Sequence, residues 1–198
     1  MSTTRLESFS DGVIAVAITL LVLNIAVPTH PLHLGHDLAK QWPVYAAYVT
    51  SFITIGIIWI NHHVMIGRLA RADHSILVLN LVLLLTIGVI PFGTSLMARY
   101  LKAGHGDKLA AAIYAGVFLL MAVAFTALNR QILVGRPQLL KDELTLEQRR
   151  RILARSVSGL IPYVVAVAVA ALSPYATLAI CAAVGAFYAL PIASTPAS

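Results

Sequence analysis

A few polar side chains stand inside long apolar stretches of this sequence, where they could take part in chemistry. Ser10 and Asp11 open the first apolar stretch, the segment WINHH ends another at residues 59–63, and Asn80 lies inside a third. A carboxylate beside an imidazole can relay a proton, hold a metal ion or form a buried hydrogen-bond network. Which of these applies depends on what the apolar stretches are.

The apolar stretches are typical of a membrane protein. The chain has 198 residues, of which 59% are hydrophobic and 11% are charged, whereas a soluble domain has about 45–50% apolar and about 25% charged residues. A membrane-spanning helix needs about 20 mostly apolar residues. Six segments qualify: 9–27, 43–66, 75–97, 109–132, 157–172 and 175–192. We therefore predict an all-α membrane protein with one domain, residues 1–198, and six transmembrane helices per chain.

Lys and Arg are distributed unequally between the predicted loops. With the N-terminus inside, the inner side holds Arg5, Arg68, Arg71, Arg130, Arg136, Lys141, Arg149, Arg150, Arg151 and Arg155. The outer side then holds Lys40, Arg99, Lys102 and Lys108. Because cytoplasmic loops carry the excess of Lys and Arg, we expect a multi-pass protein of the cell inner (plasma) membrane with both termini in the cytoplasm. The basic residues form no stripe on a soluble face, so we expect no nucleic-acid partner.

The second predicted helix brings three polar side chains to one face, because His62 and His63 follow Trp59 by three and four residues. His62 or His63 has a ring N–H that can pair with Asp11, and Asn80 offers both a donor and an acceptor. Such pairing makes a buried carboxylate less costly. Two interpretations stay open. The network only locks the helices together, or it also fixes the rotation of the first helix so that another face can act.

That other face of the first helix carries an aliphatic stripe with one hydroxyl. At about 100° per residue, Val16, Thr19, Leu20 and Leu23 cluster on one side, and Asp11 lies about 140° from Val16. If Asp11 points into its own subunit, the stripe points elsewhere. Thr19 either bonds back to the carbonyl four residues earlier or serves whatever lies along this face.

A proton-coupled transporter is the main alternative function for the same residues. Asp11 with His62 or His63 would form the proton relay, since intramembrane carboxylate and imidazole pairs mark such relays. However, no inverted half-repeat and no paired Gly/Pro-interrupted helices are visible in the sequence.

Metal and catalytic sites have weaker support. His30, His33 and His36 in the predicted outer loop are three residues apart, and imidazole suits zinc, copper or nickel. A proline and a glycine between them argue against a continuous helical face, and no further ligand is close in sequence. The metalloenzyme spacings H-E-x-x-H and H-x-x-E-H are absent, and Cys181 is isolated. We expect no enzyme activity, no metal and no cofactor.

The longest inner connection predicts a short helix of its own. Thr145 followed by Gln148 is a capping-box pattern, and a run of arginines comes next. We expect this helix to lie at the membrane interface. Its arginines serve either as contacts to anionic lipid headgroups or as an ordinary positive-inside anchor.

Three motifs resemble one family of membrane proteins. The segment RLESFSD at 5–11 matches the pattern R-x-x-x-F-S-D of the transmembrane protein 175 potassium channel family, bacterial branch. The segment WINHH at 59–63 and the segments NLVLLL and PFGT, at 80–85 and 91–94, are also similar to motifs of that family. The resemblance extends over all six predicted spans by order and length, with specific motifs in the first three.

The resemblance implies a fold and an activity. Bacterial members have one six-helix unit per chain and form homotetramers, in which the first helix of each subunit lines a central, leak-type potassium pore without a carbonyl-loop filter. The resemblance places pore constrictions at Val16, Leu20 and Leu23, where rings of aliphatic side chains gate by dewetting. It also places a hydroxyl that selects the ion at Thr19. Other members often have Ile or Leu at the position of Val16, so we expect a wider constriction there. It also implies a structural hydrogen-bond network of Arg5, Phe9, Ser10, Asp11, Trp59, Asn61, His62, His63 and Asn80.

Overall fold

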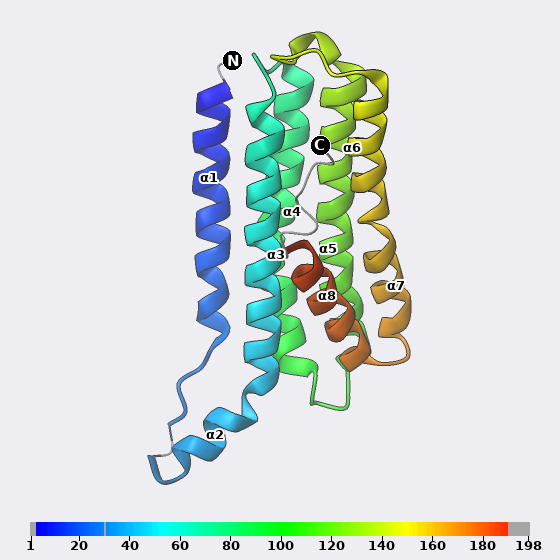
Figure 1. Ribbon diagram of the computed structural model, residues 1–198. Helices are drawn as coiled ribbons and strands as arrows, with labels where there is room; N and C mark the ends of the chain where they lie inside the picture. The colour runs from blue at the N-terminus through cyan, green and yellow to red at the C-terminus, as the bar shows by residue number, and fades with distance from the viewer. Residues whose placement is uncertain (1–2, 30, 190–198) are drawn as a thin grey trace.

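The computed structural model describes residues 3–29 and 31–189, and within them the chain forms helices and loops without a named strand (Figure 1). The helices are α1 (Thr3–Leu20), η1 (Leu21–Asn24), η2 (Pro31–His33), α2 (Leu34–Lys40), α3 (Trp42–Gly67), α4 (His74–Tyr100), α5 (Asp107–Arg130), η3 (Gln131–Gly135), η4 (Pro137–Leu139), α6 (Leu146–Ser158), α7 (Ile161–Ala170) and α8 (Pro174–Ala189). Five helical stretches are long and apolar enough to cross a membrane: Thr3–Asn24, Trp42–Gly67, His74–Tyr100, Asp107–Gly135 and Leu146–Ala170.

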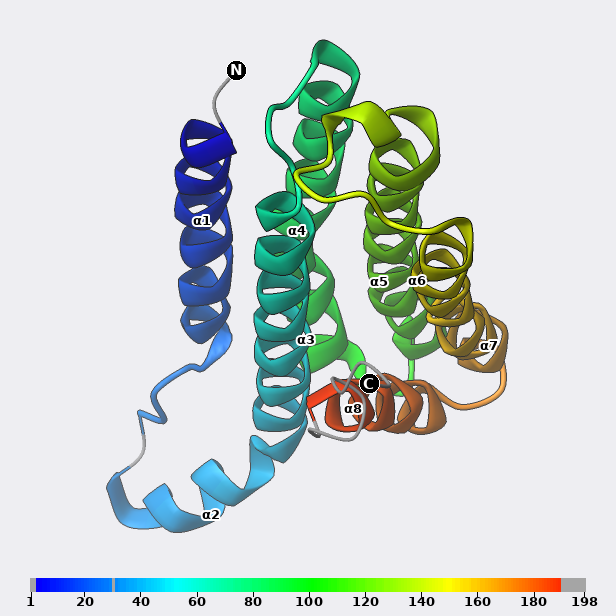
Figure 2. The ribbon, with the colours of Figure 1, turned by 45° about the horizontal axis from the view of Figure 1, so that its top comes forward.

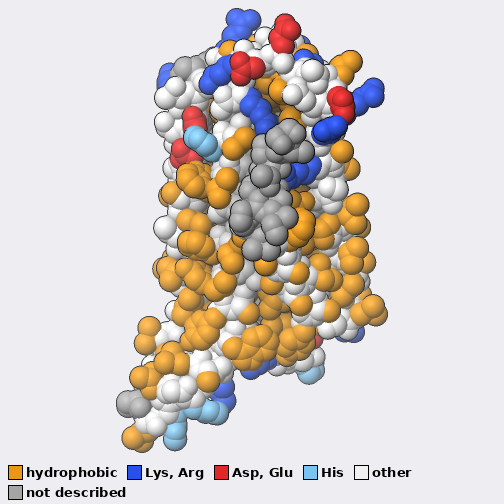
Figure 3. Space-filling view, in the orientation of Figure 1, with side chains coloured by type: hydrophobic (Ala, Val, Ile, Leu, Met, Phe, Trp, Pro, Cys, Tyr) orange, Lys and Arg blue, Asp and Glu red, His pale blue; other side chains and the backbone are white. Residues whose placement is uncertain are grey.

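The long helices form an antiparallel bundle with α1 at its edge. Helix α1 packs against α3 and α4, whereas α5 packs against α4, α7 and α8 in the middle of the bundle (Figures 1 and 2). The core there includes an aromatic pair, since the buried rings of Tyr114 and Phe118 meet edge to face at 4.8 Å between centroids. Figure 3 shows hydrophobic side chains over the middle of one face, with Lys and Arg gathered at the end where α1 begins.

The first helix is shifted relative to the predicted span 9–27. Helix α1 begins at Thr3, and it tightens into the 3₁₀ helix η1 after Leu20. The chain is extended at Ile25. Val27 precedes Pro28, and a residue before a proline is disfavoured in the helical conformation. In a 3₁₀ turn, side chains three residues apart eclipse each other, so Leu23 stays on the same side as Leu20.

The last two predicted spans differ from the observed helices. The capping box at Thr145 and Gln148 is present, but α6 continues in line with α7 along α5 instead of lying flat at the interface, so that prediction is wrong (Figure 1). Helix α8 has 16 residues, so its length is about 24 Å. The hydrocarbon core of a bilayer is thicker, at about 30 Å. The end of the predicted span 175–192 lies outside the described residues.

The loops at the end where α1 begins are fastened to each other by polar contacts. Asp73 caps α4, since its Oδ1 accepts from the Ile76 backbone N–H at 3.0 Å and from the Ser75 hydroxyl at 2.8 Å. Its Oδ2 accepts from Arg136 Nε at 2.6 Å. The Ile76 N–H, with further help from Ser75 and Arg136, lowers the pKa of the Asp73 carboxyl below its usual 3.8.

Removing the Asp73 charge is expected to reduce the loss of stability in acid. Because the folded-state pKa is lowered, the ionised carboxylate stabilises the fold at pH values above about 4, and this contribution disappears as the pH falls through the lowered pKa. Asp73→Asn should therefore show a smaller fall in thermal unfolding temperature between pH 6 and pH 3 than the unmodified protein. Asp142→Asn, in an exposed loop, is the matched control. Equal falls in all three proteins would contradict the prediction.

Candidate functional site

Helix α1 has one face buried in the protomer and another that points away from it. The buried side chains are Leu6, Ser10, Ile14 and Ala17, spaced three or four residues apart against α3 and α4. On the other side, Val16 is 58% exposed, Leu20 is 43% exposed and Leu23 is 75% exposed. Thr19 is also exposed. The aliphatic stripe therefore lies on the surface of the single chain.

A fully buried hydrogen-bond chain joins α1, α4 and α3. Asn80 donates from Nδ2 to Ser10 Oγ at 3.0 Å, and Ser10 Oγ donates to the Leu6 carbonyl at 2.8 Å. Asn80 Oδ1 lies 2.7 Å from His62 Nε2, which must carry the proton because the amide oxygen can only accept. Ser10, His62 and Asn80 have no exposed surface. These hydrogen bonds connect the buried face of α1 to α4 and, through Asn80, to α3.

Two further pairs connect α1 to α3 at its margin. Trp59 Nε1 donates to Asp11 Oδ1 at 2.9 Å, and His63 Nδ1 lies 2.5 Å from Glu7 Oε1. The predicted pairing of Asp11 with His62 or His63 is therefore wrong. Helices α1 and α3 run in opposite directions. One turn toward the N-terminus of α1, from Asp11 to Glu7, therefore corresponds to one turn toward the C-terminus of α3, from Trp59 to His63.

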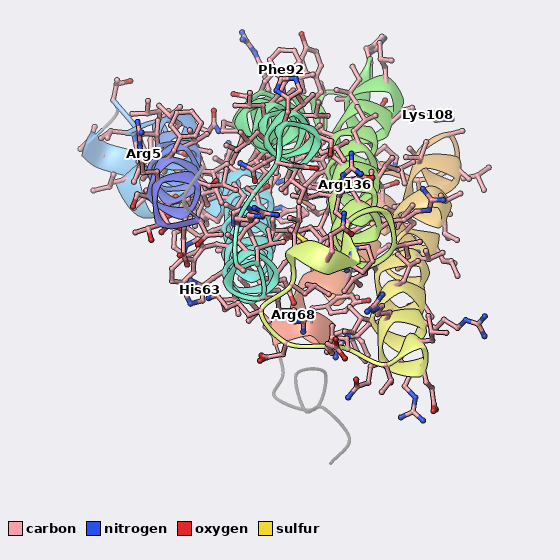
Figure 4. All side chains as sticks on the ribbon, turned by 90° about the horizontal axis from the view of Figure 1, so that it is seen from above. Arg5, His63, Arg68, Phe92, Lys108 and Arg136 are labelled. Carbon is pink, nitrogen blue, oxygen red and sulfur yellow. The ribbon has the colours of Figure 1, made fainter. Side chains whose placement is uncertain are left out.

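Three residues of the predicted network do not join these contacts. Arg5 is exposed and extends from α1 on the side away from α3 (Figure 4). Phe9 is 53% exposed. Asn61 donates to the Ile57 carbonyl of its own helix at 2.8 Å. Within the described part of the chain, none of the three bonds to another member of the network.

Sequence reasoning missed three residues that hold α1 in place. Glu7 pairs with His63, and its position four residues before Asp11 was the available signal. At the far end, the Ser95 hydroxyl of α4 donates to Asn24 Oδ1 at the end of η1. No pattern in the sequence marks Ser95 as a partner of Asn24. The helix that carries the stripe is thus fastened at both ends.

The Thr19 hydroxyl donates to backbone carbonyls of its own helix. Its Oγ1 lies 2.9 Å from the Val16 oxygen and 3.0 Å from the Ala15 oxygen. A hydroxyl has one proton and two lone pairs. Because the proton is used within the helix, the lone pairs are left to face outward, and an oxygen in this state can act as an acceptor toward a cation.

A shallow apolar groove on α1 includes two residues of the stripe, Val16 and Leu20. It has a volume of about 500 Å³, and its lining is Ser8, Phe9, Gly12, Val13, Val16, Ala17 and Leu20 of α1 with Gly88 of α4. No side chain with a formal charge lines it. The groove is therefore suited to apolar side chains.

The outer-loop histidines form no metal centre among the described residues. His33 and His36 are exposed, and no group of three or more His, Cys, Asp or Glu side chains within the described ranges could hold a metal ion. His30 lies outside the described residues.

Asn80 is expected to matter more for stability than a similar residue outside the buried chain. Asn80→Ala leaves His62 Nε2 without an acceptor in a site without water contact, which costs about 1–3 kcal/mol of unfolding free energy. Asn61→Ala, which removes a bond within one helix at the surface, should cost less than about 0.5 kcal/mol. Denaturant unfolding in mixed micelles, followed by tryptophan fluorescence, compares the two. Equal costs would contradict the assignment of the buried chain.

Comparisons with known proteins place these features among ion channels. Residues 5–91, which contain α1, α3 and most of α4, match the family model described as "Endosomal/lysosomal potassium channel TMEM175". A potassium channel of Streptomyces collinus is 48% identical over 126 residues, which are 63% of this chain and 61% of that protein. A potassium channel of Chryseobacterium sp. is 32% identical over 173 residues, covering 85% of this chain and 82% of the relative.

A solved structure resembles nearly the whole chain. The crystal structure of a lysosomal potassium-selective channel TMEM175 homolog from Chamaesiphon minutus has a TM-score of 0.83 at 36% identity, and the match covers 96% of this chain and 97% of that one. The curated relatives from Streptomyces collinus and Chamaesiphon minutus are matched over 61% and 64% of their own lengths.

Proposed function

The chain belongs to the TMEM175 potassium channel family, and we propose that it conducts potassium passively through a membrane pore lined by α1. The observation that carries this proposal is the division of α1 into two faces. Its polar side is held by Ser10, Asn80 and His62, while Val16, Leu20 and Leu23 are exposed. A helix that lines a pore must keep one face toward the pore axis, and these hydrogen bonds would hold α1 in such an orientation.

The pore forms where four chains meet around one axis. Each chain contributes six helices, the shorter α8 included. Val16, Leu20 and Leu23 then form stacked rings that stop ion flow when the space between them loses its water. Val16 is the smallest of the three, so the ring it forms is the widest.

Thr19 supplies the preference for potassium over sodium. Potassium gives up its hydration water at lower cost than sodium, and aliphatic rings offer nothing to replace that water. Four Thr19 oxygens, with their lone pairs directed outward from each α1, replace part of the hydration shell. Conduction is leak-like, in the cell inner (plasma) membrane. The ten basic residues at the end where α1 begins support cytoplasmic termini.

The transporter alternative has less support from the geometry. A proton relay between Asp11 and an imidazole needs the two groups to be in contact, but Asp11 accepts from Trp59, and His62 bonds to Asn80. We retain a passive channel as the function.

Potassium release from liposomes tests this function directly. Vesicles loaded with KCl and diluted into an impermeant cation should release potassium slowly until a protonophore is added, because a channel moves charge and builds up a voltage. Addition of the protonophore should then increase the release at least tenfold. An electroneutral proton exchanger would release potassium without the protonophore and acidify the vesicles, which would overturn the proposal.

A further inference from the structure

A second hollow lies between the last helices of the bundle, away from α1. It has a volume of about 450 Å³, and it is lined by Ser158 of α6, Pro162 of α7, and Ile180, Ala183, Val184, Phe187 and Tyr188 of α8. Known ligand sites measure about 300–1,000 Å³. Only the Ser158 and Tyr188 side chains in this lining carry polar atoms. The hollow therefore suits an apolar ligand with a polar end.

Helices α6 and α7, which frame one side of this hollow, face outward from the protein. In the span Leu146–Ala170, only 11% of the most apolar window is buried inside the chain. This span has 25 residues, which correspond to about 37 Å and exceed the about 30 Å of the hydrocarbon core. The first turns of α6 thus reach the headgroup region of one leaflet, and the hollow lies deeper, beside the acyl chains.

Arginines stand on α6 above the hollow, at its headgroup end. Arg151 is about 20° and Arg155 about 60° from Ser158 around the helix axis. Arg155 is exposed, and its side chain has no bonding partner within the described residues. Arg151 is bound to Glu147, with 2.5 Å between Nη2 and Oε1.

We propose that this hollow binds an anionic phospholipid of the leaflet that surrounds α6. The lipid phosphate accepts hydrogen bonds from the Arg155 and Arg151 guanidinium groups, which match phosphate oxygens in a forked geometry. One acyl chain lies against Pro162, Ala183 and Phe187. Basic pockets between membrane helices are known to select charged lipid headgroups in this way.

The charges argue against other occupants of the hollow. A second copy of the same face would bring Arg151 and Arg155 against like charges on its partner. A potassium ion is repelled by the same arginines, so this site is independent of the ion pathway. An anionic lipid alone complements both the apolar floor and the positive rim.

Counting the bound lipids tests the charged rim. Protein purified from vesicles of equal phosphatidylglycerol and phosphatidylcholine is analysed by native mass spectrometry. The unmodified protein should retain phosphatidylglycerol in preference, and Arg155→Gln should retain at least threefold less. Arg150→Gln is the matched control, because Arg150 lies about 140° from Arg155 around α6; it should retain as much as the unmodified protein. Equal loss in both variants, or equal retention of the two lipids, would overturn the proposal.

Filling the hollow tests the apolar floor without changing any charge. Ala183→Phe should lower phosphatidylglycerol retention at least threefold, whereas Ala168→Phe, on an exposed face of α7 outside the hollow, should leave retention unchanged. No loss in Ala183→Phe would overturn the proposal. Lipid retention is read without ion flux, so its outcome is separate from that of the channel.

Photocrosslinking identifies what occupies the hollow. With p-benzoylphenylalanine in place of Phe187, which is 60% exposed, irradiation in the same vesicles should yield a phosphatidylglycerol adduct. A crosslink to residues 190–198 of the same chain, or to a second copy of the chain, would show another occupant and overturn the proposal.

Discussion

Thr19→Ala is expected to lower the potassium-over-sodium permeability ratio about fivefold to thirtyfold, which corresponds to about 1–2 kcal/mol of lost discrimination. The reason lies in the bonding of Thr19. Its proton is donated to carbonyls of α1, so its oxygen is available to a passing cation. Alanine leaves only aliphatic groups on the stripe, which cannot replace hydration water. Reversal potentials of reconstituted channels in mixed potassium and sodium solutions measure the ratio.

Two matched variants separate the role of the Thr19 oxygen from general damage. Thr19→Ser keeps an oxygen at the same place and should retain most of the discrimination. Thr86→Ala removes a hydroxyl that also bonds within its own helix, 2.7 Å from the Leu83 oxygen, but lies on α4. It should leave the ratio unchanged. An unchanged ratio in Thr19→Ala would remove this residue from the selectivity mechanism.

Leu23→Asn is expected to raise potassium flux about tenfold, the effect of lowering a barrier by about 1.4 kcal/mol. Leu23 is the most exposed of the three aliphatic residues of the stripe, and the proposed ring of four leucines excludes water at the end of the pore. Amide groups hold water in the ring and remove the dewetting barrier. Potassium release from liposomes at matched protein content, with the protonophore present, measures the flux.

The control for Leu23 is another exposed leucine at the same end of the bundle. Leu172, in the turn between α7 and α8, is 81% exposed, so Leu172→Asn should leave the flux unchanged. A flux in Leu23→Asn equal to that of the unmodified protein would show that Leu23 does not limit conduction.

The helices were predictable where hydropathy alone decides them. The spans 43–66 and 75–97 differ from α3 and α4 by only a few residues at their ends. The ends of α1 were less predictable, because polar residues such as Arg5 continue the helix into the headgroup region. The 3₁₀ helix η1 ends at Asn24, which accepts a tertiary hydrogen bond from Ser95 that no pattern in the sequence reveals.

The two faces of α1 followed from helical periodicity, but the partners of its polar face did not. The unusual depth of Ser10, His62 and Asn80 in apolar segments predicts that they form polar contacts. Which imidazole meets which carboxylate depends on how far α3 is shifted along α1, and a single sequence carries no information on that shift. Asp11 consequently meets Trp59, and Glu7 takes His63.

Cysteine accessibility at Leu23 tests the central claim, that the stripe of α1 faces the conduction path. The native Cys181 is buried, so a charged thiol reagent should act on an introduced cysteine alone. We expect the reagent to abolish potassium release in Leu23→Cys and to have no effect in Val164→Cys, on an exposed face of α7. If Leu23→Cys conducted potassium normally after complete modification, α1 would not line the pore.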